Sequence, residues 1–259
     1  MFRSTLAVTL LVFSLQSASA AIFERDNRFA ASASVDPAVR AIAQAYFRSR
    51  KATAFLIGRC HAATSQHLVS MASDPVGARV SLRLFHNKTR LRTTVVDAGH
   101  LERHNSSVDY LRDWVLLRLD NCLPEGTPTF GLALQPREGN VATAGYPSDL
   151  SGATLEWNCR IRALTARGLL HDCASYPGAS GSPIFIRTAD GAPVAVAIQA
   201  AARRSHSPEP FRLDLANVAT PVAALVGALL RDKALMVKRS QAAPAFGADA
   251  THSPLRFAR

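Results

Sequence analysis

The chain has 259 residues, of which 48% are hydrophobic, so it can bury one large core or two joined smaller ones, and extensive disorder is excluded. The formal net charge is +11, from 30 lysines and arginines against 19 acidic residues, and it favours attraction to anionic surfaces. The basic residues are scattered, with only short runs at 48–51 and 203–204. Because no aromatic residues interleave them in a patch, we expect no nucleic-acid module.

The first 20 residues have the pattern of a secretory signal peptide. Arg3 precedes an apolar run from Leu6 to Leu15, and the small residues 18–20 suit a cleavage site. The apolar run is too short to span a membrane. We therefore expect an exported soluble protein, secreted or periplasmic, whose mature chain starts at Ala21 or Ile22.

Four cysteines, Cys60, Cys122, Cys159 and Cys173, would meet an oxidising compartment after export. Their even number, and the absence of a Cys-x-x-Cys spacing, favour two disulfides over a metal site. The residues alone leave all three pairings open.

After the signal, residues 21–37 read as an N-terminal arm, and the alanine-rich stretch 38–47 predicts either a helical turn or a first strand. Short, partly alternating apolar segments then predict strands, and a Pro/Gly-rich segment at 122–128 separates two halves. We expect a first β-barrel over 38–126 and a second over 127–220. Apolar residues at helical spacing predict a helix over 221–237, packed on the second barrel, and a flexible tail over 238–259. The predicted strands lie at 54–57, 62–69, 80–85, 91–96, 114–119, 140–147, 155–164, 169–173, 183–186, 194–200 and 215–221.

A glycine-flanked serine, Ser180, precedes one of these apolar runs. Small neighbours at Gly178, Ala179 and Gly181 let the backbone turn sharply beneath the hydroxyl, as a nucleophile requires. The same turn can direct the amide N–H groups of Gly178 and Ser180 at one point, which would form an oxyanion hole.

The segment Gly178 to Pro183 resembles the nucleophile loop of chymotrypsin-like serine endopeptidases, in the Gly-x-Ser-Gly-Ser-Pro form of the bacterial branch that includes the glutamyl endopeptidases. Residues 22–28 are similar to the segment that opens many members of this branch. The resemblance covers roughly residues 22–225. It implies an all-β fold of two packed six-stranded antiparallel β-barrels with a C-terminal helix, in agreement with the predicted strands.

The resemblance also implies a catalytic triad of His67, Asp113 and Ser180. His67 ends a predicted strand like the family's Leu-Thr-Ala-Ala-His segment, with Ser65 and Gln66 in place of the two alanines. Asp113 precedes a buried strand, as the family's orienting acid does. His61 competes as the base, and Asp109 and Asp120 compete as the acid. His171 and Asp172 are adjacent on a strand, so they face opposite sides and cannot act as a pair.

Further assignments follow from the same resemblance. The disulfides would be Cys60 to Cys122 in the first barrel and Cys159 to Cys173 in the second. Ala174, Ser175 and Gln199 would line the substrate pocket, and none of them carries a charge, so we expect a neutral pocket. Ala179 cannot form the ion pair with a new N-terminus that activates the digestive relatives.

The predicted function is a secreted serine endopeptidase that cleaves peptide bonds in protein or peptide substrates through an acyl-enzyme. We expect a monomer that needs neither a metal nor an organic cofactor. One alternative is a basic secreted binding protein on a protease scaffold, its triad impaired by Ser65 and Gln66. Another is an esterase, which would share the chemistry and differ in substrate.

Overall fold

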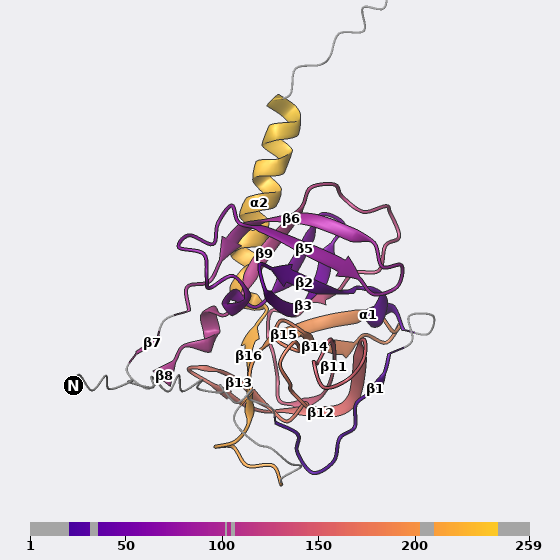
Figure 1. The fold of residues 1–259 in the computed structure, drawn as a ribbon, viewed down its shortest axis with the longest axis vertical. Helices are drawn as coiled ribbons and strands as arrows, with labels where there is room; N and C mark the ends of the chain where they lie inside the picture. The colour runs from indigo at the N-terminus through magenta and orange to yellow at the C-terminus, as the bar shows by residue number, and fades with distance from the viewer. Residues whose placement is uncertain (1–20, 32–35, 102, 105–106, 203–209, 243–259) are drawn as a thin grey trace, which may run out of the picture.

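The structure is a computed structural model that describes residues 21–31, 36–101, 103–104, 107–202 and 210–242. The predicted signal peptide and residues 243–259 of the predicted tail lie outside the described residues. Figure 1 shows two strand-rich bodies, one above the other, with a long helix beside the upper one. In the described part of the chain, no helix is both long and apolar enough to cross a membrane.

The first barrel closes through six antiparallel strands in the order β2-β3-β4-β9-β6-β5. Its strand β5 alternates strictly between exposed and buried residues, which is the period-two pattern of a sheet with one face on the core. The stretch 38–47 contains both predicted alternatives, because Asp36 caps a single helical turn, α1, and a strand follows it. The elements are α1 (Pro37–Arg40), β2 (Ile42–Phe47), β3 (Arg50–Gly58), β4 (His61–Thr64), β5 (Arg79–Leu84), β6 (Arg90–Ala98) and β9 (Val115–Leu119).

The second barrel closes in the same way, in the order β12-β11-β14-β15-β16-β13, with β13 pairing back to β12. Two short strands lie outside this ring, β1 on β12 and β10 on β15. The fold is therefore the predicted pair of six-stranded antiparallel barrels. The elements are β1 (Phe29–Ala30), β10 (Gly131–Leu132), β11 (Gly139–Gly145), β12 (Thr154–Thr165), β13 (Gly168–His171), β14 (Pro183–Arg187), β15 (Pro193–Ala201) and β16 (Asn217–Pro221). A separate two-stranded sheet, β7 (Arg103–His104) with β8 (Ser107–Val108), lies in the chain between β6 and β9.

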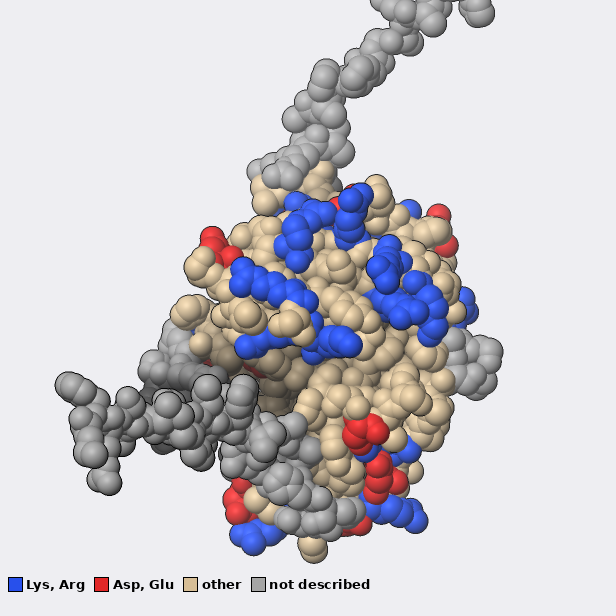
Figure 2. Space-filling model, viewed as in Figure 1, with Lys and Arg blue, Asp and Glu red and all other residues tan. Residues whose placement is uncertain are grey.

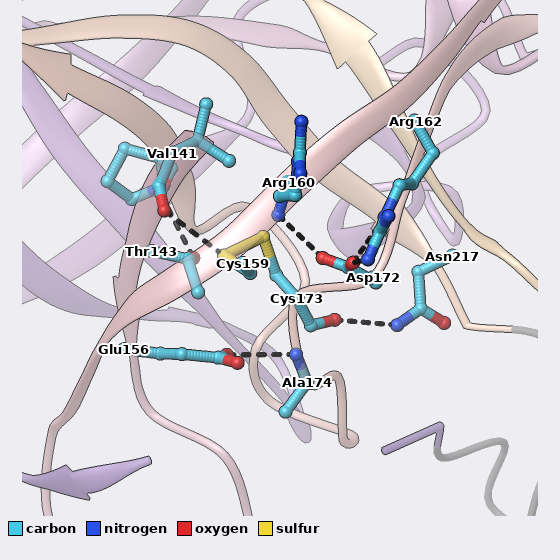
Figure 3. Close-up of a disulfide and its surroundings, with 11 residues drawn as sticks. Val141, Thr143, Glu156, Cys159, Arg160, Arg162, Asp172, Cys173, Ala174 and Asn217 are labelled. Carbon is cyan, nitrogen blue, oxygen red and sulfur yellow. Dashed lines mark hydrogen bonds and ion pairs between the residues drawn. A yellow bond between two sulfur atoms is a disulfide. The ribbon is translucent and has the colours of Figure 1, made fainter. Parts of the chain in front are cut away.

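Both implied disulfides are present. Cys60 binds Cys122, which joins the β3–β4 turn to the segment after β9. Cys159 on β12 binds Cys173, which follows β13 (Figure 3). Two structural disulfides are typical of proteins that fold in an oxidising compartment.

Aromatic side chains join the cores of the two barrels. Phe130, in the connection between them, packs edge-to-face on Phe55 of β3 and on Phe185 of β14, with ring centroids 5.3 Å apart in each case. One buried apolar cluster therefore contains residues of both barrels. This shared core holds the facing loops of the barrels in a fixed relation.

The helix α2 (Ala223–Ala242) packs on the first barrel, and the prediction that it packs on the second was wrong. Its buried residues Leu225, Ala228 and Leu229 belong to the core cluster that includes the first barrel. Asp232 of α2 accepts hydrogen bonds from His61 Nε2 at 2.8 Å and from Arg118 at 2.7 Å. These contacts with β4 and β9 supply the physical reason, because they join the helix to strands of the first barrel. The helix also continues past the predicted boundary at residue 237.

Replacing Asp232 with alanine should lower the free energy of unfolding by about 2–3 kcal/mol, because it leaves His61 and Arg118 without their buried carboxylate. The matched control is Asp97→Ala, which removes an exposed ion pair between β6 and Arg231 of the same helix and should cost less than about 1 kcal/mol. Urea denaturation measures both values. Equal losses in the two variants would contradict this account of helix docking.

Candidate active site

The structure brings His67 and Asp113 together. His67 lies in a 3₁₀ turn, Gln66–Leu68, directly after β4, and Asp113 lies just before β9. Because β4 and β9 pair through Thr64 and Val115, the two residues meet at one end of the barrel. Asp113 Oδ2 lies 2.8 Å from His67 Nδ1, and its Oδ1 accepts from the His67 backbone N–H at 2.9 Å.

This geometry determines which ring nitrogen of His67 carries a proton. Asp113 is fully buried, whereas the His67 side chain is 31% exposed. An ionised carboxylate only accepts hydrogen bonds, so Nδ1 of His67 must carry the proton. Nε2 is then free to accept a proton from solvent or from a ligand.

The competing residues have other partners. His61 binds Asp232 at the far end of β4, Asp109 caps the turn before Asp113, and Asp120 binds Arg79. His171 is fully buried, and loss of solvation lowers its pKa to about 3, so it stays neutral. Asp172 binds Arg162, so it does not face the ring of its neighbour.

The serine loop, residues 176–182, is held against the first barrel through Thr53 of β3. The Thr53 backbone N–H donates to the Ser180 carbonyl at 2.8 Å, and its hydroxyl donates to the Gly178 carbonyl at 2.8 Å. Gly181 adopts a φ of +82°, and a Cβ atom there would lie 2.1 Å from the Thr53 carbonyl, so only glycine fits this approach. The contact places the serine loop beside the strand pair that leads to His67. Within the described residues, no hydrogen bond joins the Ser180 hydroxyl to His67.

The amides of Gly178 and Ser180 are available to a ligand. The Pro177 carbonyl accepts from Ser148 N–H at 2.7 Å, and in a trans peptide the Gly178 N–H points the opposite way. Within the described residues, neither the Gly178 nor the Ser180 N–H has a protein acceptor. Two unpaired donors in one tight turn can bind a negatively charged oxygen.

Two of the three predicted pocket residues are in direct contact. Gln199 Nε2 donates to Ser175 Oγ at 2.9 Å, and both side chains are buried. The third, Ala174, donates its backbone N–H to Glu156 Oε2 at 2.9 Å (Figure 3). Burial raises the pKa of Glu156 to about 7. A carboxyl group that is neutral below about pH 7 therefore lies behind the pocket residues.

A groove of about 610 Å³ extends from His67. Gln66, Tyr110, Ala200 and Ala201 are among the residues that line it. Ser65 is fully buried and Gln66 nearly so, and the Ser65 hydroxyl and the side-chain amide oxygen Oε1 of Gln66 lack partners in the described part of the chain. The turn nevertheless presents the His67 ring to Asp113. No group of three or more potential metal ligands occurs among the residues that the structure describes.

The N-terminal arm contacts the serine loop. Ala21, fully buried, pairs with Ser175 through two backbone hydrogen bonds of 2.9 Å. Arg28, whose side chain is 4% exposed, binds both Asp26 and Asp149 and lies 4.7 Å from the ring centre of Tyr176. Since Asp149 follows Ser148, Arg28 holds both segments that make the Ser148–Pro177 hydrogen bond.

Sequence reasoning missed Thr53, Glu156 and the role of Arg28. Thr53 could have been noticed as a lone polar residue in the apolar run 52–57. Arg28 lies in residues 22–28, which resemble the opening segment of the family branch. Its partner Asp149 is 121 residues away, so the sequence did not reveal this pairing. Nothing in the pattern around Glu156 signals its burial.

Comparisons with known proteins agree with this architecture. A family model described as a trypsin-like peptidase domain matches residues 52–196. No curated protein sequence matches the chain.

Solved structures give the same result for the fold. A Glu endopeptidase in complex with MPD is similar to this chain, with a TM-score of 0.62 and 16% identity over 83% of this chain and 100% of that one. Neuropsin, a serine protease of mouse brain, gives 0.54 and 17% over 77% and 96%. A serine endoprotease from Yersinia pestis gives 0.52 and 18% over 77% and 64%. At these identities the likeness concerns the fold.

The pKa of Glu156 predicts a pH dependence of stability. Its ordinary value is 4.5, and burial raises it to about 7, so between these values the folded chain keeps a proton that the unfolded chain releases. Stability should therefore fall as the pH rises from about 4.5 to 7, by about 2–3 kcal/mol. Glu156→Gln keeps an acceptor for Ala174 and should remove this fall in urea denaturation. Glu125→Gln removes a charge at an exposed turn and serves as the control; an unchanged slope in Glu156→Gln would contradict the assignment.

Arg28→Ala should loosen the segments that flank the serine loop. Hydrogen exchange at the amides of Ser175 and Ser148 should accelerate at least tenfold, because Ser175 N–H bonds to the arm that contains Arg28 and Ser148 lies next to its partner Asp149. Arg187→Ala is a matched control: Arg187 also pairs with an aspartate, Asp36, and lies 4.7 Å from an aromatic ring, but away from the loop. The same acceleration at both amides in both variants would contradict a specific role of Arg28.

Proposed function

Because the chain belongs to the trypsin-like peptidase family, and is thus a peptidase of serine-protease fold, we propose that it is a serine endopeptidase with the triad His67, Asp113 and Ser180. The observation that carries this proposal is the bidentate contact of Asp113 with His67, with the serine loop held beside them by Thr53. Catalytic hydrogen bonds to the nucleophile often form only with substrate bound.

In the proposed mechanism, Ser180 Oγ attacks the carbonyl carbon of a peptide bond while His67 Nε2 takes the hydroxyl proton. Asp113 holds the ring and stabilises the imidazolium. The unpaired amides of Gly178 and Ser180 support their proposed role, which is to bind the oxyanion of the tetrahedral intermediate. His67 then gives its proton to the leaving amine, and water, activated by the same imidazole, hydrolyses the acyl-enzyme.

The proposed pocket for the residue before the cut is formed by Ala174, Ser175 and Gln199. The Gln199–Ser175 hydrogen bond supports a preformed pocket, and none of the three side chains carries a charge. Such a pocket would select a neutral side chain by shape and hydrogen bonding. The substrates would be proteins or peptides, and the enzyme would act as a monomer without a cofactor.

Export before folding is part of the proposal. The two disulfides support folding in an oxidising compartment, secreted or periplasmic. Removal of a signal peptide after Ala20 would leave Ala21 as the first residue, and its nitrogen would still donate to the Ser175 carbonyl.

A fluorophosphonate probe should label the wild-type protein at Ser180, and Ser180→Ala should abolish labelling. Asp113→Asn should slow it by roughly three to four powers of ten, because the imidazole loses its orienting acceptor. Ser182→Ala is the control within the same loop, since its buried hydroxyl has no partner among the described residues. Mass spectrometry of the labelled peptide reports the site. Equal labelling of Ser180→Ala and wild type would refute the triad.

A further inference from the structure

A second groove, of about 620 Å³, is lined in part by Gly178 and by none of the three predicted pocket residues. It is lined by Lys51 of β3, Arg83 of β5, Lys88, the segment around Tyr146 and the Pro177–Gly178 turn, so both barrels contribute to it. We call it the basic groove. Because it begins at the amide that would bind the oxyanion, a substrate chain leaving the serine would enter it.

The charged residues that line the basic groove are all positive. Three cations line it, and none of the described lining residues is acidic. Within the described residues, no carboxylate lies in ion-pair distance of Lys51, Arg83 or Lys88. The acid nearest along the chain, Asp149, already accepts two hydrogen bonds from Arg28, at 2.9 and 2.6 Å. Figure 2 shows that lysine and arginine side chains gather on the face of the first barrel.

Tyr146 is an aromatic residue that lines the basic groove, and Phe85 packs against it. Phe85 packs edge-to-face on Tyr146 at 6.2 Å, and the Lys88 ammonium lies 4.4 Å from the Phe85 ring centre. Burial raises the pKa of Tyr146, so its hydroxyl stays neutral and adds no negative charge. Cations that line a cleft focus a positive potential more strongly than the same cations on a convex surface.

We propose that the basic groove binds an acidic side chain of the substrate, at one of the first three residues after the cleaved bond. Unpaired cations that face a cleft would attract a carboxylate there, whereas the cation beside the pocket residues, Arg28, is already paired with Asp26 and Asp149. This inference rests on the proposed function. It makes Lys51 and Arg83 specificity-determining residues, with Lys88 as a third cation.

The test starts from a peptide library. Cleavage mapping by mass spectrometry should show aspartate and glutamate enriched at one of these three positions. A pair of quenched fluorescent peptides that differ only by glutamate or glutamine at that position should then differ about five- to tenfold in kcat/KM at low salt, since each exposed charge pair contributes up to about a fivefold factor. The ratio should fall toward one as salt is raised.

Substitutions of the groove cations test whether the basic groove causes the preference for glutamate. The double variant Lys51→Gln, Arg83→Gln should reduce the glutamate-to-glutamine ratio to about one or two. Arg92→Gln is the control, because Arg92 is an exposed cation of β6 outside the groove, and it should keep the wild-type ratio.

Three results would overturn the inference. If the wild type cuts the glutamate and glutamine peptides with equal kcat/KM, the inference is wrong and the proposed peptidase activity is unaffected. A double variant that keeps the preference but binds less to heparin would assign the cations to general adhesion instead. Failure to cut any peptide, together with no labelling of Ser180, would remove both this inference and the proposed function.

Discussion

The arrangement of the site depends on the hydrogen bonds of one buried residue, Thr53. Its backbone N–H binds Ser180, its hydroxyl donates to Gly178 and accepts from Tyr146 N–H, and its carbonyl accepts from Thr64. Thr53 belongs to the first barrel, and three of these contacts reach segments of the second. Since Thr64 leads directly into the turn of His67, the same network relates the imidazole to the serine loop. Such connected networks are stronger than isolated pairs, because each bond polarises the next in a low-dielectric interior.

The serine loop is also held from its outer side. Ala179, the residue before Ser180 in this loop, is buried and has no charge with which to form an ion pair. The N-terminal arm makes the compensating contacts, with Ala21 bonded to Ser175 and Arg28 placed between Asp149 and Tyr176. These contacts surround the Ser148–Pro177 hydrogen bond, which sets the direction of the Gly178 amide. The loop is therefore held on one side by a hydroxyl of the first barrel and on the other by a guanidinium of the arm.

The sequence allowed prediction of those features that depend on local pattern. Short strands and turns predicted the two barrels, and the resemblance then supplied the disulfide pairs, which the cysteine count alone left open. His67 and Asp113 were predicted from the same resemblance, which rests on the apolar strands that precede His67 and follow Asp113. The partner of α2 was mispredicted because helical spacing shows that a face is buried, but not against what; Asp232 and its distant partners decide that. Thr53 and Gly178 are 125 residues apart, and a single sequence carries no signal for such a pair.

The positions of the lysines and arginines relate the fold to the proposed preference for acidic substrates. Cations in or near the interior need acidic partners, and Arg28, Arg118 and Arg187 each have an aspartate. The excess of 11 positive charges must then lie mainly where water solvates it. Where the surface is convex, solvent and salt screen these cations almost completely. In a cleft between two barrels, less water separates a cation from a bound chain, and the same charge discriminates between ligands. The basic groove is such a place, because its three cations line a cleft to which both barrels contribute. Arg28, in contrast, is neutralised by Asp26 and Asp149 where it lies beside Gln199.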